Sequence, residues 1–471
     1  MRVHFVDRGG PAAIRVYPVS EKDLPRFLTK NPARIGAGGK KWLALGDFRG
    51  KLGSVIWLPD KSGRPSVVLL GIEGERDIWS YAALRQALPE GVYRIDAELS
   101  PDAATRAALG WALAGYSFTR YKKSTLKRPR LVWPKAADRG AVGRAADGIF
   151  LVRDLINTPA GDMGPEELAD AAKAVARAGG ARFSAIVGDQ LLRQNYPSVH
   201  AVGRASSRPP RLIDIGWGSS GPLIALIGKG VCFDSGGLDL KPANGMLLMK
   251  KDMGGGAHVL ALAQMIMAAR LPLRLRVLVP AVENSVSGNA FRPLDVLQTR
   301  KGLTVEVGNT DAEGRLILSD ALAEASTEKP ALMIDFATLT GAARVALGTD
   351  LPAMFSNDDA TAEALLRHGL AQDDPLWRLP LHKGYRSQLD SPVADINNVS
   401  EGGYGGAITA ALFLQEFVEP GIPWVHIDLM AWNLANRPGR PKGGEAMGLR
   451  AVYALIAEKA ASGAAAKGKS R

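Results

Sequence analysis

Short apolar runs alternate with amphipathic, helix-like segments through the first third of the sequence. The apolar runs cover residues 41–45, 54–58 and 66–70, and the helical patterns cover residues 77–87 and 103–114. Such an alternation is typical of a domain in which helices pack against a sheet. We therefore expect a small N-terminal α/β domain.

A longer α/β rhythm occupies the rest of the chain. Its apolar runs are continuous, and helical patterns separate them; the runs lie at residues 222–227, 273–282, 332–336 and 424–429, and the helical patterns at 257–269, 316–325 and 407–417. Continuous apolar runs indicate strands buried on both faces, and the intervening helices suit crossover connections. The predicted fold class is α/β, with a mixed central sheet flanked by helices in the C-terminal domain.

The boundary between the two domains is expected where a basic run at 120–130 gives way to Pro134 and a small, polar stretch. We assign residues 1–138 to the N-terminal domain and residues 139–471 to the C-terminal domain. The chain ends in the low-complexity stretch AASGAAAKGKSR, so roughly the last 12 residues are expected to be mobile.

Composition excludes several classes of protein. With 471 residues, 46% of them hydrophobic, the chain is able to bury a sizeable core. Its single cysteine, Cys232, excludes an intramolecular disulfide and any zinc site that needs several thiolates. Neither a signal peptide nor a membrane-spanning run is predicted, and we therefore expect a cytoplasmic protein without a membrane partner.

The net charge of +12 and the basic run RYKKSTLKRPR raise the question of a nucleic acid partner. A basic patch is the electrostatic footprint of nucleic acid binding. The basic residues are scattered along the chain, however, and a charge run is usually a solvated surface. Nucleic acid binding is therefore kept as an alternative and is not favoured.

Two other motifs carry little weight. Gly216, Gly218 and Gly221 have the GxGxxG spacing of a dinucleotide-binding turn, but a strand-like run follows where that turn needs a helix. The histidines form no HExxH pair, which argues against a zinc site of the common protease type. His258 and His426 are predicted to be structural residues.

Three segments place charged residues among apolar ones. The segments are IGKGVCFDSGGLDLKP, with Lys229, Asp234, Asp239 and Lys241; LLMKKDMGGGAH, with Asp252; and NTDAEGRLILSDAL, with Asp311, Glu313 and Arg315. Buried carboxylates are costly unless they are paired or bind a metal ion. Taken alone, each segment is explained by a salt-bridged turn or a helix cap, but their joint occurrence favours a shared site.

Four of these carboxylates, Asp234, Asp252, Asp311 and Glu313, would repel one another strongly if they met in one crevice without cations. Two divalent ions would neutralise them, and oxygen ligands without histidine or thiolate suit Mn²⁺, Mg²⁺ or Zn²⁺. Two such ions about 3.5 to 4 Å apart bridge one hydroxide and clamp a reacting carbonyl. We therefore expect a dinuclear site at the carboxyl ends of the strands, where α/β sheets usually bind ligands.

These segments resemble the signature of the leucyl aminopeptidase family, the M17 cytosol aminopeptidases. NTDAEGRL, at 309–316, is the hallmark octapeptide of that family, and the family's other motifs occur in its order: GKGVCFDSGGLDLKP, MKKDMGG, DFATLTGA, ADINN and GAITAALFLQEF. The resemblance covers the chain from about residue 145 onwards. The first 135 residues match only in their α/β character.

The resemblance implies a role for each matching residue. It implies metal ligands for two divalent ions, Mn²⁺ or Zn²⁺, at Lys229, Asp234, Asp252, Asp311 and Glu313. Lys241 corresponds to the catalytic lysine that polarises the peptide carbonyl, and Arg315 to the residue that holds a bicarbonate acting as general base. The residues that match the family's substrate-binding positions are Met249, Thr338, Leu339 and Gly341.

The function implied is hydrolysis of N-terminal amino acids, leucine and similar residues, from peptides, with a metal-bridging hydroxide as nucleophile. The family resemblance also implies a homohexamer. Two alternatives stay open: a DNA-binding regulatory protein with secondary peptidase activity, and a dipeptidase or cysteinylglycinase that uses the same site.

One departure from the family pattern is visible in the sequence Arg292, Pro293, Leu294, Asp295, where many members have RPGD. Leucine adopts a positive φ less readily than glycine. We therefore expect this turn to be shaped differently, with no effect on the site residues.

Overall fold

The computed structural model describes residues 4–10, 12–60, 65–74, 77–125 and 129–468. The chain divides into two compact units, one of residues 1–150 with 435–442 and the other of residues 151–434 with 443–471. The predicted boundary at residue 138 immediately precedes helix α5 (Arg139–Asn157), and the division at residue 150 falls inside that helix.

The first unit contains a six-stranded sheet in the order β1-β6-β5-β2-β4-β3. All neighbouring strands are parallel except β3 and β4. Its elements are β1 (Phe5–Val6), β2 (Ile14–Val19), α1 (Leu24–Lys30), α2 (Pro32–Leu45), β3 (Val55–Pro59), β4 (Pro65–Gly71), α3 (Trp79–Ala87), β5 (Val92–Ile95), α4 (Pro101–Leu113) and β6 (Arg130–Val132). The prediction of an α/β unit is confirmed.

Two details of this unit differ from the sequence pattern. The apolar run at 41–45 ends helix α2 and is not a strand, because Leu43 packs inward while Leu45 stays exposed. In the basic run at 120–130, residues 126–128 lie outside the described residues. The structure therefore describes that run only in part.

The second unit is built on a mixed sheet, as predicted. The sheet has nine strands in the order β16-β15-β18-β14-β9-β11-β8-β7, with β10 paired to β11. Strands β18, β14, β9 and β11 are parallel to one another, and β8, β7 and β15 join the sheet in antiparallel pairs. The strands are β7 (Arg182–Val187), β8 (Arg211–Trp217), β9 (Leu223–Gly228), β10 (Gly230–Asp234), β11 (Arg274–Asn284), β14 (Leu332–Ala337), β15 (Ala353–Ser356), β16 (Trp377–Arg378) and β18 (Trp424–Asp428).

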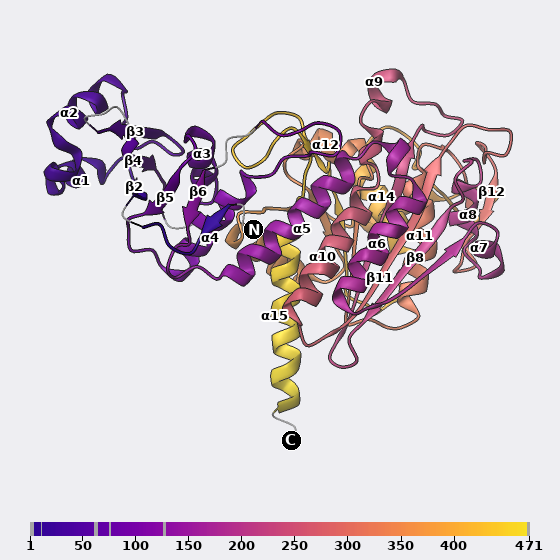
Figure 1. The fold of residues 1–471 in the computed structure, drawn as a ribbon. Helices are drawn as coiled ribbons and strands as arrows, with labels where there is room; N and C mark the ends of the chain where they lie inside the picture. The colour runs from indigo at the N-terminus through magenta and orange to yellow at the C-terminus, as the bar shows by residue number, and fades with distance from the viewer. Residues whose placement is uncertain (1–3, 11, 61–64, 75–76, 126–128, 469–471) are drawn as a thin grey trace. The chain divides into compact units, whose positions relative to one another are not determined.

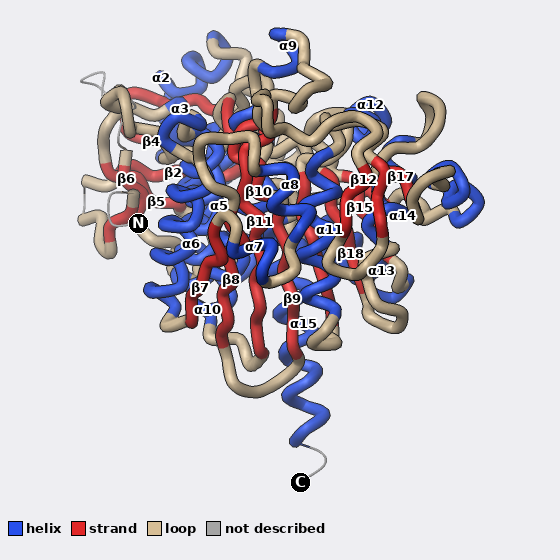
Figure 2. The backbone as a smooth tube through the Cα atoms, turned by 90° about the vertical axis from the view of Figure 1, so that its right-hand side faces the viewer, coloured by secondary structure: helices blue, strands red, loops and turns tan. Residues whose placement is uncertain are grey.

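Helices cover both faces of this sheet (Figures 1 and 2). Helices α6 and α10 pack together on one face, while α8 and α11 pack together on the other. The larger helices are α6 (Pro165–Gly179), α8 (Pro197–Gly203), α10 (Gly254–Ala269), α11 (Glu313–Ser326), α12 (Gly341–Leu347), α13 (Asp359–Ala371), α14 (Gly406–Gln415) and α15 (Leu449–Gly468). Every residue of β9 and β14 is buried, as their continuous apolar runs predict.

Short elements complete the second unit. They are α7 (Gln190–Arg193), α9 (Ala243–Met246), a small sheet of β12 (Val296–Gln298), β13 (Thr304–Glu306) and β17 (Ile396–Asn397), and a pair of β19 (Trp432–Asn433) and β20 (Gly443–Gly444). The stretch expected to be mobile at the C-terminus belongs to α15 up to Gly468, and residues 469–471 lie outside the described residues. None of the helices in the described part of the chain has both the length and the apolar character that a membrane crossing needs.

The GxGxxG motif forms no nucleotide-binding turn. Strand β8 ends at Trp217, and after a short turn the chain enters β9 instead of a helix. Gly218 and Gly221 have φ of 78° and 90°, and a Cβ on either would lie within 2.3 Å of a backbone oxygen of the strand connection at 272–273. These glycines therefore serve a tight turn.

Both histidines singled out from the sequence are structural, as predicted. The His426 ring contacts the Asp335 carboxylate at 2.6 Å inside the sheet. His258 lies in α10, where Nδ1 lies 2.6 Å from the Gly254 carbonyl oxygen and Nε2 accepts a hydrogen bond from the Met447 N–H. Because Nε2 accepts this bond, the ring is neutral in the folded chain.

The turn at Leu294 has a left-handed backbone. Leu294 has a φ of 69°, so it adopts the left-handed conformation that the family's glycine would favour. Its N–H donates to the Val307 carbonyl oxygen at 2.8 Å, which ties the turn to the strand β13 region and outweighs the strain. A left-handed conformation costs a non-glycine residue roughly 1 to 2 kcal/mol.

Stability should depend on pH through His258. Burial lowers the pKa of His258 to about 4 from the ordinary 6.5. Below pH 6.5 the unfolded chain binds a proton that the folded chain does not, so the folded state loses about 1.4 kcal/mol per pH unit until pH 4. In urea unfolding, the stability advantage of the wild type over His258→Gln should therefore shrink by about that amount per unit between pH 6 and pH 4.5. A constant difference would contradict the buried neutral ring.

Replacing Leu294 should reveal the strain in its turn. Leu294→Gly should raise the free energy of unfolding by about 0.5 to 1 kcal/mol, since relief of strain exceeds the greater freedom of glycine in the unfolded chain. Little packing is lost, because the side chain is 72% exposed. Leu294→Val is the matched control, and it should lower the stability because a β-branched side chain disfavours this φ. The opposite order of the two variants in denaturant unfolding would refute the strain.

Candidate metal centre

The candidate site lies at one edge of the large sheet, where parallel strands end. Lys229 follows β9 directly, Asp234 is the last residue of β10, and Thr338 follows β14. Since β9, β10 and β14 all end at this edge, their following residues are brought together.

Helix starts bring the remaining side chains to the same edge. Asp252 follows the short 3₁₀ helix η2 (Met249–Lys251) just before α10, and Glu313 is the first residue of α11. Two glycines permit this close packing. A Cβ on Gly255 would lie 1.9 Å from the Phe336 carbonyl oxygen, and one on Gly314 would lie 2.5 Å from Cε of Lys229.

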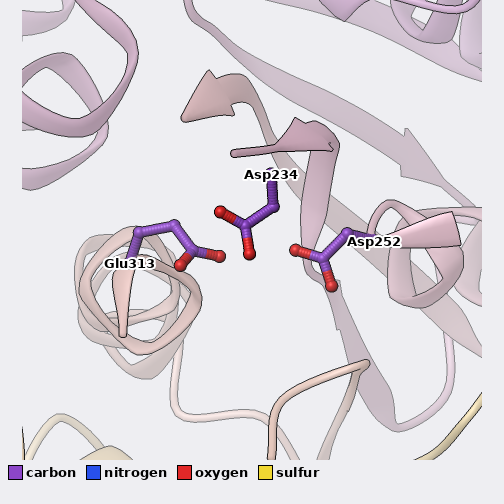
Figure 3. Close-up of side chains that lie close together, drawn as sticks. All are labelled: Asp234, Asp252 and Glu313. Carbon is purple, nitrogen blue, oxygen red and sulfur yellow. The ribbon is translucent and has the colours of Figure 1, made fainter. Parts of the chain in front are cut away.

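Three carboxylates converge at this edge. Asp234, Asp252 and Glu313 each offer an oxygen atom, and these atoms all lie within 4.8 Å of one another. Figure 3 shows the three side chains pointing toward a common centre from three separate elements. All three are buried, with exposed fractions of 3%, 2% and 0%.

Lys229 occupies the space between two of these carboxylates. Its Nζ lies 2.7 Å from Asp252 Oδ2 and 2.9 Å from Glu313 Oε1, and it donates to the Thr338 carbonyl oxygen at 3.1 Å. Burial alone would lower the pKa of Lys229, but the charges of Asp252 and then Glu313 outweigh burial and raise it. The lysine is therefore a cation in the metal-free chain.

Lys241 lies between the third carboxylate, Asp234, and a fourth one, Asp311. Its Nζ lies 2.9 Å from Asp234 Oδ2 and also contacts Asp311. Burial raises the pKa of Asp311 to about 6, with a further contribution from Asp234 and an opposing one from Lys241. Asp234 is held in place by hydrogen bonds from the Gly236 N–H at 2.8 Å and from the Asn284 amide at 2.9 Å.

The buried carboxylates are not satisfied by their protein neighbours. Among the described residues, Glu313 Oε2 has no hydrogen bond partner, while Glu313 Oε1 and Asp252 Oδ2 have only their ion pairs with Lys229. Burial and the charge of Asp234 raise the pKa of Glu313 well above its usual range. Unsatisfied, buried oxygens of hard ligands around one centre fit divalent cations.

Arg315 presents a guanidinium beside this cluster. Its Nη1 donates to the Asn398 carbonyl oxygen at 2.7 Å, while Nε is buried without a partner in the described part of the chain. The Asn398 side chain is itself fixed, since it accepts from the Gly308 N–H and donates to the Asn309 carbonyl oxygen. Burial lowers the pKa of Arg315 to about 10. An anion would satisfy the unused donors.

One cavity of about 380 Å³ joins these groups. The sequence-predicted residues that line it are Lys229, Asp234, Lys241, Met249, Asp252, Asp311, Arg315, Thr338, Leu339 and Gly341. Glu313 is fully buried beside it. Asp239 does not line the cavity, because its carboxylate accepts from the backbone N–H and the hydroxyl of Thr310.

Sequence reasoning missed four residues that belong to this region. Asn284 orients Asp234, and its signal was a polar residue at the end of a long apolar run. Lys251 and Arg344 line the cavity, although neither was singled out. Asp428 ends β18 and accepts hydrogen bonds from the backbone and hydroxyl of Thr340, and no signal in the sequence placed it there.

Two family models match the chain. The cytosol aminopeptidase family, catalytic domain, matches residues 150–453, and the M17 aminopeptidase N-terminal domain matches residues 14–134. A protein of Caulobacter vibrioides named a probable cytosol aminopeptidase is 37% identical, over 97% of this chain and 99% of its own length.

Solved structures agree with these matches over nearly the whole chain. The crystal structure of cytosol aminopeptidase from Coxiella burnetii has a TM-score of 0.91 and 48% identity, covering 96% of this chain and 99% of its own. The bottromycin maturation enzyme BotP, in a structure described as a complex with Mn, has a TM-score of 0.85 and 33% identity, covering 95% of this chain and 100% of its own.

Both domains, the motifs at the sheet edge and the relatives therefore agree: the chain belongs to the cytosol aminopeptidase family, M17, whose members are metal-dependent hydrolases, and it is an aminopeptidase.

Proposed function

We propose that this aminopeptidase removes N-terminal residues from peptides at a dinuclear metal centre. The observation that carries the proposal is the convergence of Asp234, Asp252 and Glu313, each of which offers an oxygen within 4.8 Å of the others, together with Glu313 Oε2, which has no partner among the described residues. The relative BotP, whose structure is described as a complex with Mn, supports a divalent ion such as Mn²⁺ or Zn²⁺.

Five side chains would hold the two ions. As the family resemblance implies, Lys229 and Asp252 would hold one ion and Asp311 the other, and Asp234 and Glu313 would contribute to both. A lysine binds a metal ion only as a neutral amine, so Lys229 would have to give up the proton that it carries beside Asp252 when the site is loaded. When bound, the two ions supply an activated water and polarisation of the scissile carbonyl.

Lys241 and Arg315 supply the remaining chemistry. Lys241 has its ammonium within the cavity beside Asp234, where it donates a hydrogen bond to the oxygen of the scissile carbonyl as negative charge develops. Arg315 keeps donors available after its bond to Asn398, and its planar guanidinium suits a bicarbonate through two parallel hydrogen bonds. A bicarbonate held there would supply the general base for the attacking water.

The wider setting of this activity follows from the family resemblance. We propose peptides with N-terminal leucine and similar residues as substrates, a homohexamer as the assembly and the cytoplasm as the location. No observation on the described residues favours the DNA-binding or cysteinylglycinase alternatives over aminopeptidase activity.

Removal of divalent ions should abolish the activity. After dialysis against a chelator, hydrolysis of leucine p-nitroanilide should fall to background, and added Mn²⁺ or Zn²⁺ should restore it. Metal analysis of the reloaded protein should give two ions per chain, while circular dichroism of the stripped protein controls for unfolding. Full activity in a folded, metal-free protein would contradict the proposal.

Substitution of Lys241 should affect catalysis more than metal binding. Lys241→Ala should lower kcat by on the order of 10² to 10³, the usual effect of removing one charge-stabilising donor, and should leave the metal content unchanged. Lys173→Ala, an exposed position on α6, is the matched control and should show the wild-type kcat. An unchanged kcat in Lys241→Ala would refute the assigned role.

A further inference from the structure

The cavity carries more positive charge than the proposed metal centre uses. Three carboxylates line it, against five cationic side chains: Lys229, Lys241, Lys251, Arg315 and Arg344. Lys229 and Lys241 are paired with the carboxylates, and Arg315 donates to the Asn398 carbonyl oxygen. Lys251 and Arg344 are therefore the two cations without an assigned task.

Arg344 points back over the start of its own helix. It lies one turn after Gly341 in α12, and helical side chains tilt toward the N-terminus. A Cβ on Gly341 would lie 3.7 Å from Arg344 Nη2, so the guanidinium sits over this glycine at the cavity wall. The Arg344 side chain makes no hydrogen bond or ion pair with any residue that the structure describes; its backbone carbonyl oxygen accepts from the Gly348 N–H.

Lys251 is almost completely buried and still unpaired. Its side chain is 1% exposed and lines the same cavity, yet it makes no hydrogen bond or ion pair within the described residues. Buried lysines are rare without a partner, because an unpaired charge is poorly solvated in the protein interior. The ammonium therefore has no carboxylate in direct contact among the described residues, and the negative charges that act on it are the more distant ones of Asp252 and Asp428.

The neighbouring carboxylates are engaged elsewhere. Asp252 pairs with Lys229 at 2.7 Å, and Asp428 accepts from both the hydroxyl and the backbone N–H of Thr340. Neither of them contacts Lys251 in a salt bridge. A negatively charged group supplied from outside the chain would satisfy the two cations together.

Resting on the proposed aminopeptidase function, we propose that the cavity, besides leucine and similar first residues, accepts aspartate and glutamate and prefers them to their uncharged amides, through Arg344 and Lys251. The apolar walls of Met249 and Leu339 accommodate the methylene groups of such a side chain, and its carboxylate meets the cations. Gly341, which matches a family substrate-binding position, lies under the Arg344 guanidinium and ties this charge to the first side-chain pocket.

The test compares substrates that differ only in charge. The kcat/KM of the Mn²⁺-loaded enzyme for glutamate p-nitroanilide should exceed that for glutamine p-nitroanilide on the order of tenfold, the usual scale of a charge-assisted hydrogen bond. Raising the NaCl concentration should reduce this ratio, because the half-buried Arg344 is partly screened. A ratio of one or less would overturn the proposal.

Variants assign the preference to the two cations. Arg344→Gln and Lys251→Met should each lower the glutamate-to-glutamine ratio several-fold, whereas Arg344→Lys should keep most of it. Arg193→Gln, at an exposed position in α7, is the matched control and should keep the wild-type ratio. A ratio that survives both Arg344→Gln and Lys251→Met would overturn the assignment.

The carboxylate that meets the two cations has two possible sources: the side chain of an acidic first residue and the C-terminus of a dipeptide. A further pair of substrates distinguishes these two sources. If Leu-Gly is cleaved faster than Leu-Gly amide, and Arg344→Gln removes that difference while glutamate gains nothing over glutamine, the first-residue proposal is overturned. Hydrolysis of leucine p-nitroanilide without a glutamate preference overturns this inference alone. If the metal-loaded enzyme hydrolyses neither leucine p-nitroanilide nor glutamate p-nitroanilide, the proposed function is overturned together with this inference.

Discussion

The burial of three carboxylates at one sheet edge is the constraint on which the rest of this structure depends. Asp234, Asp252 and Glu313 are buried, and in the described part of the chain only the Lys229 ammonium contacts a carboxylate oxygen of Glu313. Without cations this arrangement is costly, since desolvated like charges repel. In the metal-free chain Lys229 and Lys241 compensate part of the charge, and the remainder is what divalent ions would neutralise.

The fold meets this constraint through backbone packing. Strands β9, β10 and β14 end at the same edge, and glycines at the starts of α10 and α11 let those helices approach without side-chain clashes. Gly314 leaves the space that the Lys229 side chain occupies. The glycines in the motifs MKKDMGG and NTDAEGRL therefore have a packing role as well as a place in the family signature.

Much of this architecture was predictable because local patterns determine it. Continuous apolar runs predicted β9, β11, β14 and β18, since a strand covered on both faces has no polar positions. The run at 41–45 was different, because so short an apolar stretch is equally compatible with the end of a helix, as in α2. The left-handed φ of Leu294 goes against the local preference of leucine, and a tertiary hydrogen bond from its N–H to the Val307 carbonyl oxygen holds the turn.

The sequence by itself determined the family, the α/β class and the side chains expected to bind metal, because these depend on residue types at fixed spacings within short motifs. Only the tertiary structure showed that the Asn284 amide donates a hydrogen bond to Asp234, and that Lys251 and Arg344 line the same cavity. It alone grouped residues 435–442 with the N-terminal unit. Such relations join segments far apart in the chain, and the packing of the whole sheet and its helices decides them.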